Sequence, residues 1–294
     1  MLICIVTATA ASLVSARFAN KEQSRTVGLV TGCVLTLLGA SMLILNYWGF
    51  LSGFDLFVEI LHCIGTLVAF IIPCLIILLP VRFLTNIPSF VFRKLLHIVA
   101  VTCVSLTILT SKSWQAASMT CVIFAVIIYP LLTLVEKEGW YPKLFVEKTK
   151  GEIRRSLLML FFMVAFLIMV CWGFFNEPNL CAASILMWGT GDAAAALFGI
   201  PYGKHKIKTR WTDGKKSWEG SLSMFVVSFA SGLLMLLLTH DSGLGYVLLS
   251  ALSGALLGAM TELFSPSEYD TITVPAVIAA VLLIINSTVH VLHF

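Results

Sequence analysis

The amino-acid sequence predicts an all-α protein, a polytopic transmembrane helical bundle. Of its 294 residues, 59% are hydrophobic and only 12% are charged, whereas about a quarter of a soluble globular chain is charged. The mean hydropathy of +0.98 marks an apolar excess that one soluble core does not bury. The short alternating strands of a membrane β-barrel are absent from the sequence. We therefore expect a single integral membrane domain, residues 1–294, and no nucleic-acid partner.

Apolar runs define the expected helices, since a helix needs about 17–25 such residues to cross a bilayer. Nine or ten runs qualify, because the first and the fourth are short. No positive residue precedes the first run, so we expect a retained helix and not a secretory signal. The predicted spans are 1–16, 27–47, 56–80, 95–110, 115–135, 156–175, 179–199, 218–239, 243–264 and 272–292.

Lysine and arginine in the connecting loops predict the orientation of these spans. Four alternate loops hold 18 of the 19 Lys and Arg residues, and Lys112 is the exception. The positive-inside rule then places these loops in the cytosol and the N-terminus outside. The four loops are 17–25, 81–94, 136–155 and 200–217.

An acid lies inside the apolar span 179–199, in the stretch GTGDAAAALFG. Insertion of such a carboxylate costs about 2.5–3.5 kcal/mol, and acids within a membrane are usually functional. Asp192 shares one helical face with Gly189, Ala196 and Gly199, where a neighbour or a ligand can approach closely. A polar lock between helices is the alternative interpretation.

A second acid ends the span 243–264. Gly254, Gly258 and Glu262 lie four residues apart and share one helical face. This pattern is typical of a functional acid near the cytosolic surface. It is also typical of plain GxxxG packing, with Glu262 among the lipid headgroups.

Basic residues lie at the same expected face. In FRKLLHI, Arg93 and Lys94 stand at the cytosolic start of the fourth span, and His97 lies one turn further on. A site for a negatively charged ligand is one interpretation of this motif. The alternative roles are ordinary positive-inside anchors and, for His97, a packed polar side chain.

The loop YGKHKIKTRWTDGKKSWEGS is strongly basic. It carries seven basic or imidazole side chains between Lys204 and Lys216, together with glycines and the acid Glu219. Ammonium groups and backbone N–H donors in such a loop suit a polyphosphate. Attraction to anionic lipid, at about 1 kcal/mol per basic residue, is the alternative. The string GIPYGKH is not a P-loop, because it is one residue short, lacks Ser or Thr after the lysine and follows no strand.

The predicted topology brings these motifs and Asp270 to one face of the membrane. Carboxylates that hold Mg²⁺, beside lysines that neutralise phosphate charge, are what a site for a metal–nucleotide complex needs. The sequence therefore predicts a nucleotide-dependent site on the cytosolic face.

Three motifs carry a resemblance to a known family. GDAAAALFG…YGKHKI…GKKSWEGS resembles the signature of the CTP-dependent lipid kinases, which include phytol, farnesol and dolichol kinases and a CTP-dependent diacylglycerol kinase. Arg93–Ile98 matches the family's Arg-Lys-x-x-His element, and Thr261–Val277 resembles its last motif, an acid followed by Asp-Asn-x-x-x-Pro. Thr271 stands where that motif has Asn. The match covers about residues 90–280, and the family is related to phosphatidate cytidylyltransferase.

The resemblance implies a membrane-embedded kinase that transfers the γ-phosphoryl group of CTP to the hydroxyl of a lipid alcohol. A polyprenol- or phytol-type isoprenoid is the favoured acceptor and diacylglycerol the next, with Mg²⁺ as cofactor and the bilayer as surroundings. The alternatives are a phosphatidate cytidylyltransferase and, from another class, an ion-coupled transporter. The sequence does not predict the oligomeric state.

The expected site residues fall into three groups, and whether Asp192 binds metal or takes the hydroxyl proton stays open. The catalytic group is Asp192, Lys216 and Glu262. The nucleotide-binding group is Arg93, Lys94, His97, Gly199, Gly203, Lys204, His205, Lys206, Lys215, Ser217 and Gly220. The metal-binding group is Asp192, Glu219, Glu262 and Asp270.

Overall fold

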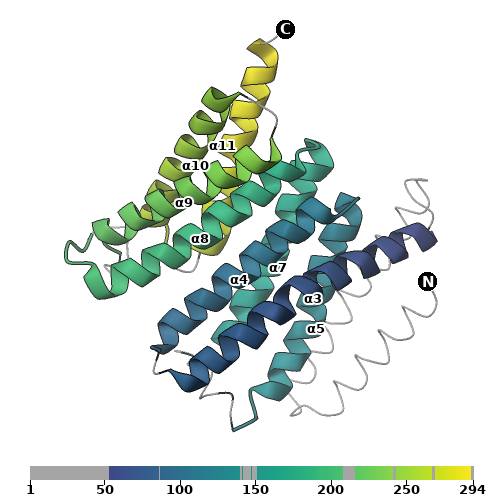
Figure 1. Cartoon of the computed structure of the whole chain (residues 1–294), viewed down its shortest axis with the longest axis vertical. Coiled ribbons are helices and arrows are strands. Elements are labelled where there is room, and N and C mark those ends of the chain that lie inside the picture. The colour runs from purple at the N-terminus through teal and green to yellow at the C-terminus, as the bar shows by residue number, and fades with distance from the viewer. Residues whose placement is uncertain are drawn as a thin grey trace.

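The computed structural model describes residues 53–85, 87–139, 141, 147, 151–207, 216–240, 243–266 and 269–292. These residues are helical and connecting segments, with one isolated antiparallel bridge between Lys206 and Ser217. The prediction of an all-α protein is therefore confirmed (Figure 1). The helices are α3 (Gly53–Leu84), α4 (Ser89–Thr110), α5 (Trp114–Val135), α7 (Glu152–Leu167) with its π-helical continuation η1 (Ile168–Phe174), α8 (Pro178–Tyr202), α9 (Trp218–Thr239), α10 (Leu244–Phe264) and α11 (Asp270–Leu292).

Eight helices of the described residues are long and apolar enough to cross a membrane. They correspond to the third to tenth predicted spans, which confirms the multi-pass prediction. The predicted spans 1–16 and 27–47 lie outside the described residues. The outside location of the N-terminus stays a prediction.

Two helices, α4 and α7, begin several residues before the predicted spans, because charged side chains lie inside their first turns. Helix α4 begins at Ser89, so Arg93 and Lys94 occupy its first two turns. Helix α7 begins at Glu152 and includes two arginines. Long basic side chains can bury their stems and extend their charges toward water, so hydropathy alone places such helix ends too late.

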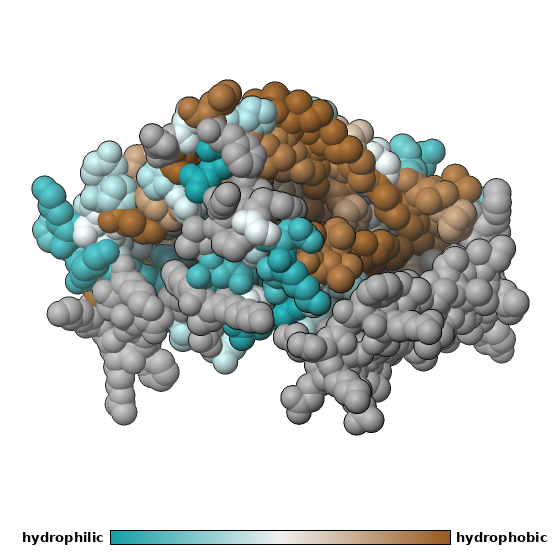
Figure 2. All heavy atoms as spheres, turned by 90° about the horizontal axis from the view of Figure 1, so that it is seen from below, coloured by the Kyte–Doolittle hydropathy of each residue, from teal (hydrophilic) through white to brown (hydrophobic). Residues whose placement is uncertain are grey.

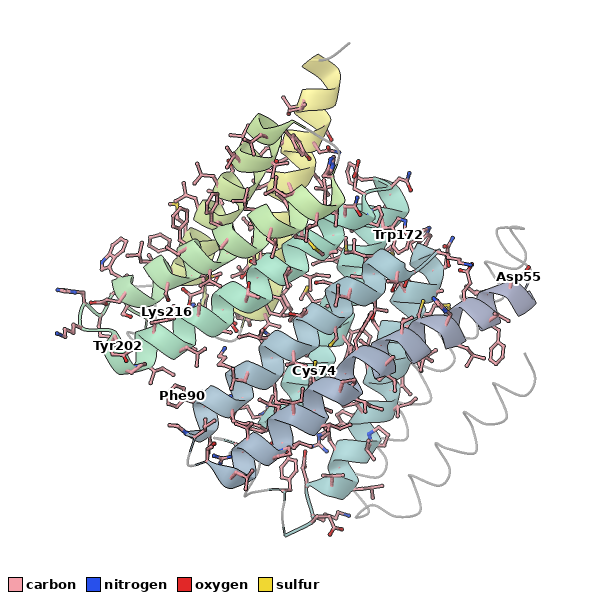
Figure 3. All side chains as sticks on the ribbon, in the orientation of Figure 1. Asp55, Cys74, Phe90, Trp172, Tyr202 and Lys216 are labelled. Carbon is pink, nitrogen blue, oxygen red and sulfur yellow. The ribbon has the colours of Figure 1, made fainter. Side chains whose placement is uncertain are left out.

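The two ends of the bundle are easily distinguished in Figure 3. Phe90, Tyr202 and Lys216 lie together at one end, whereas Asp55 and Trp172 lie at the other. We call the end with Phe90, Tyr202 and Lys216 the site end. Seen from below, hydrophobic residues form a broad surface beside a group of hydrophilic ones (Figure 2), and large exposed side chains such as Ile77 suit contact with lipid.

Helix α8 is the centre of the bundle. Of its most apolar stretch, 67% is buried, compared with 6% in α3 and at most 50% in the other spans. Helices α4 and α9 both pack along it, and α11 also lies against it (Figure 1). Because α8 is enclosed on several sides, its small residues decide how closely its neighbours approach.

The small-residue face predicted around Asp192 is divided between two neighbouring helices. A methyl group on Gly189 would lie 2.5 Å from Val101 of α4. One on Gly199 would lie 3.1 Å from the Cα of Gly220 in α9. These glycines therefore allow close helix packing on both sides of the acid.

The glycines of α10 serve packing as well. A methyl group on Gly254 would meet Met187 of α8 at 3.0 Å, and one on Gly258 would meet Ile278 of α11 at 2.8 Å. The packing interpretation of this GxxxG pattern is thus correct for the two glycines. It leaves Glu262, one turn further on, to be explained by its polar contacts.

We expect Gly191→Ala to destabilise the bundle by about 1–3 kcal/mol, the usual cost of overpacking. A methyl group there would lie 2.1 Å from Ser228 Oγ. That hydroxyl donates a hydrogen bond to the carbonyl oxygen of Met187 at 2.7 Å, so it has little freedom to move. Thermal unfolding of the purified variant in detergent measures the effect.

Gly65→Ala is the matched control, because a methyl group on this helical glycine has nothing within 4 Å. We expect it to be neutral or stabilising by about 0.4–1 kcal/mol, as for other unstrained Gly→Ala changes. Equal melting temperatures for the two variants would contradict the close-packing account of α8 and α9.

Candidate active site

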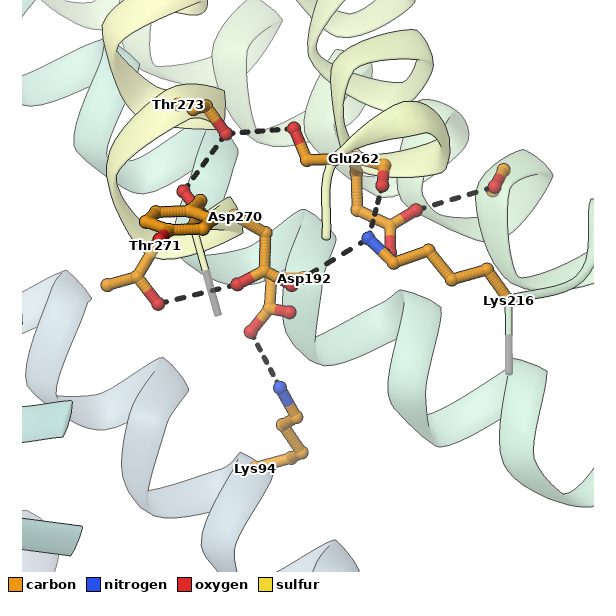
Figure 4. A network of polar contacts seen from close by, with 10 residues as sticks. Lys94, Asp192, Lys216, Glu262, Asp270, Thr271 and Thr273 are labelled. Atoms are coloured by element: carbon orange, nitrogen blue, oxygen red, sulfur yellow. Dashed lines mark hydrogen bonds and ion pairs between the residues drawn. The ribbon is translucent and has the colours of Figure 1, made fainter. Parts of the chain in front are cut away.

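Charged side chains from four helices and one connection meet at the site end of the bundle (Figure 4). Helix α4 contributes its first turns, α8 its second half, α10 its last turn and α11 its first residue, while a lysine comes from the residues just before α9. We call this group the lysine–carboxylate cluster. Its members are Lys94, His97, Asp192, Lys216, Glu262 and Asp270.

Lys94 and Asp192 form a close ion pair within the cluster. Lys94 Nζ donates to Asp192 Oδ2 at 2.6 Å, a charge-assisted hydrogen bond between α4 and α8. About a fifth of the lysine side chain and a quarter of the aspartate side chain remain exposed, 19% and 25%. The pair is therefore shielded from bulk water but can be reached from the site end.

His97 lies on the same carboxylate from the next turn of α4. Its Nε2 is 3.6 Å from Asp192 Oδ2, beyond hydrogen-bond distance, and is buried without a hydrogen-bond partner. The edge of its ring faces Trp188 at a centroid distance of 5.2 Å. His97 is thus held between an indole and a carboxylate.

Lys216 joins the other two acids of the cluster. Its Nζ lies 3.0 Å from Glu262 Oε1 and 3.7 Å from Asp270 Oδ2, and it also donates to the main-chain oxygen of Glu262. Only 10% of the lysine side chain is exposed. Ser221, one turn into α9, donates to Glu262 Oε2 at 3.5 Å.

Asp192 and Asp270 face the same small space from α8 and α11. In Figure 4 their carboxylates lie between Lys94 on one side and Lys216 on the other. Asp270 interacts electrostatically with Asp192 and with both lysines, and Asp192 likewise interacts with Lys216. The two halves of the cluster thus form one electrostatic unit.

The carboxylates fit Mg²⁺ in number and type. Mg²⁺ in nucleotide enzymes usually takes one or two carboxylates and completes its shell with phosphate oxygens and water. Asp192 and Asp270 supply two such carboxylates at one place. Within the described part of the chain, no three His, Cys, Asp or Glu side chains are arranged to hold a metal ion.

Glu219 does not contact the other acids of the predicted metal-binding group. Its Oε1 lies 2.6 Å from His205 Nδ1, and its carboxylate also accepts a hydrogen bond from the His205 main-chain N–H. The His205 side chain is 78% exposed. This contact ties the connection between α8 and α9 to the first turn of α9, outside the lysine–carboxylate cluster.

The predicted glycines bring the two ends of this connection together. Gly199 and Gly220 approach closely, and a methyl group on Gly203 would lie 2.4 Å from Ser217 Oγ. Ser217 also begins α9, since its hydroxyl accepts the Gly220 N–H at 3.3 Å. The remaining predicted loop residues are Lys204 and Lys206, both exposed near the bridge to Ser217, and Lys215, which lies outside the described residues.

Arg93 turns away from the cluster. Its Nη1 lies 3.3 Å from Glu152 Oε1 at the start of α7, and its side chain is 38% exposed. Glu147 stabilises the start of α7, because its carboxylate accepts hydrogen bonds from Gly151 N at 2.8 Å and from Tyr141 Oη at 2.9 Å. Burial raises the pKa of the Tyr141 phenol, so Tyr141 donates that bond as a neutral hydroxyl.

Two residues of the site were missed in the sequence, although helical spacing contained the signal. Trp188 lies four residues before Asp192 and packs against His97. Ser221 lies four residues after Ser217 and reaches Glu262. In a helix, residues four apart share a face, so each stands one turn from a predicted site residue.

Comparison with known proteins finds phytol kinases. The chain is 35% identical over 124 residues to the phytol kinase of Synechocystis sp., a match over 42% of this chain and 52% of the relative. It is 30% identical over 161 residues to a probable chloroplastic phytol kinase of Zea mays, over 53% of this chain and 50% of the relative. A probable chloroplastic phytol kinase 2 of Glycine max is 28% identical over 157 residues. No family model and no solved structure matches the chain.

The chain spans about half the length of the curated relatives that it matches. A relation to phosphatidate cytidylyltransferase stays an expectation from the sequence. Over its aligned half, the chain is a homologue of the phytol kinases, which supports the relation to the CTP-dependent lipid kinases that its motifs predict.

Proposed function

We propose that this protein is a membrane-embedded kinase that transfers the γ-phosphoryl group of CTP to the hydroxyl of a lipid alcohol. A phytol-like isoprenoid alcohol is the favoured acceptor, because the similar proteins are phytol kinases. The observation that carries the proposal is the lysine–carboxylate cluster, in which two lysines meet three acids at one end of an apolar bundle.

The lysines suit the phosphate groups of a nucleotide. Phosphoryl transfer depends mainly on positioning and on neutralising the charge of the moving group. Lys94 and Lys216 supply two ammonium groups from opposite sides of the cluster. The exposed Lys204 and Lys206, with His205, would extend this positive surface toward the rest of the triphosphate.

Asp192 and Asp270 are the residues that would hold Mg²⁺. The bound ion would neutralise charge on the phosphate oxygens. Asp192 lies inside the apolar α8, so it is also the acid best placed to meet a hydroxyl that arrives from the membrane, and to accept its proton. The lipid would enter sideways and keep its hydrocarbon chain among the helices, with the site on the cytosolic face.

The direct test is to incubate the purified protein with γ-labelled CTP or ATP and a panel of lipid alcohols. We expect the label on an isoprenoid alcohol and CDP as the second product. Pyrophosphate released with phosphatidate as acceptor would instead indicate cytidylyl transfer. Substrate uptake into proteoliposomes without nucleotide turnover would overturn the kinase proposal in favour of transport.

We expect Asp192→Asn to lower lipid phosphorylation by about 10²–10⁴-fold, the usual contribution of a positioned proton acceptor. The amide can neither take the proton nor hold a cation with a full charge. Rates are compared at saturating nucleotide and alcohol, and thermal unfolding reports whether the variant is folded. Glu59→Gln is the matched control, because this acid bonds Ser113 at the other end of the bundle. A folded Asp192→Asn variant of normal rate would show that the site is wrongly assigned.

We expect Lys216→Gln to lower kcat/KM for the nucleotide by about 10–100-fold, since a hydrogen bond to a charged group is worth about 1.5–3 kcal/mol. The KM for the alcohol should stay unchanged, because the lysine would bind phosphate and not the acceptor. Lys112→Gln serves as control, as this lysine lies between α4 and α5, away from the site end. An equal rise in both KM values would contradict the assigned role.

A further inference from the structure

Glu262 is the most enclosed acid of the lysine–carboxylate cluster. Its residue is only 8% exposed. One carboxylate oxygen lies 3.0 Å from Lys216 Nζ, and the other accepts a hydrogen bond from Ser221 at 3.5 Å. Its main-chain oxygen accepts a further bond from Lys216. Both ends of the carboxylate are therefore engaged by neighbours within the protein.

The backbone around Glu262 is fixed by helix packing. It lies in the last turn of α10, four residues after Gly258, whose close contact with Ile278 joins α10 to α11. The neighbouring Leu263 is buried as well, with 3% exposure. A carboxylate fixed in this way can hold a flexible partner in one orientation.

Lys216 is such a partner. Its side chain is a flexible four-carbon stem and would lose considerable rotamer freedom on binding a phosphate. Two contacts with Glu262 already restrict it, and its Nζ reaches toward Asp270 at 3.7 Å. These contacts therefore restrict the lysine side chain before any ligand binds, which lowers the entropy cost of binding.

We propose that Glu262 is a positioning residue, which holds the Lys216 ammonium group where a nucleotide phosphate binds and does not itself bind Mg²⁺. The inference rests on the proposed function. It differs from the metal-ligand role expected from the sequence, because Asp192 and Asp270 face the shared space whereas Glu262 faces Lys216 and Ser221. Glu262 acts on the nucleotide only through the lysine.

A double-mutant cycle tests this dependence. Binding of Mg–CTP is measured by calorimetry in detergent for the wild type, Glu262→Gln, Lys216→Gln and the double variant. We expect Glu262→Gln to weaken binding about 10-fold and Lys216→Gln about 10–100-fold. The double variant should bind as Lys216→Gln does, within about 2-fold, because residues that act through one another are not additive. The magnesium concentration for half-maximal binding should be unchanged in Glu262→Gln.

Each other outcome overturns the inference. If the two single losses of Mg–CTP affinity multiply in the double variant, or if Glu262→Gln needs more magnesium, Glu262 contacts the nucleotide or the metal independently of Lys216. The proposed function would then be unaffected. A wild-type affinity for Glu262→Gln would deny it any role. Failure of the wild-type protein to bind Mg–CTP would overturn the proposed CTP-dependent function and this inference together.

Two further variants keep the test independent of folding. Glu177→Gln is the matched control, since this acid accepts a hydrogen bond from Asn286 at 2.8 Å at the other end of the bundle. It should leave Mg–CTP affinity unchanged. If Glu262→Gln does not fold, Ser221→Ala removes one of the hydrogen bonds to Glu262. Its smaller loss of affinity should likewise vanish in the Lys216→Gln background.

Discussion

A carboxylate inside an apolar helix needs a positive partner, and this constraint governs the arrangement of the bundle. An unpaired buried charge costs several kcal/mol or neutralises itself, on the order of the net stability of a domain. Asp192 meets the constraint through Lys94 at 2.6 Å. The lysine can reach it only if the first turns of α4 lie beside the second half of α8. The close contact of Gly189 with Val101 supports the same placement by packing.

The cluster divides its charges between two kinds of structural element. The acids Asp192 and Glu262 lie within helices, and Asp270 begins one. Lys216, by contrast, precedes α9 and is held by contacts with acids. Sites on helices are more precise than sites on loops. The arrangement therefore combines acids fixed on helices with one lysine from a connecting segment, and contacts with those acids hold this lysine in place.

Much of this architecture was predictable, because length and hydropathy report directly on helices that cross a bilayer. The alternation of charged loops also predicted that Lys94, Asp192 and Glu262 share one end. Individual partners were not predictable. Arg93 and Lys94 are neighbours, yet one bonds Glu152 and the other Asp192. Successive helical residues point about 100° apart, so the rotation of α4 about its own axis decides which of the two faces Asp192. Glu219 lies outside the cluster because its carboxylate bonds His205, a contact that depends on the geometry of the local loop and not on helical spacing.

The sequence separation of 98 residues between Lys94 and Asp192 has a consequence for how the protein is made. At a synthesis rate of about 5–20 residues per second, Lys94 exists for about 5–20 seconds before its partner emerges. Asp270 appears later still. Lys94 can wait near the helix end with its ammonium group extended to the membrane surface. Asp192 lies further inside α8, and its short side chain does not extend its charge to the membrane surface. Lys94 is therefore already present as an ion-pair partner when Asp192 enters the bilayer.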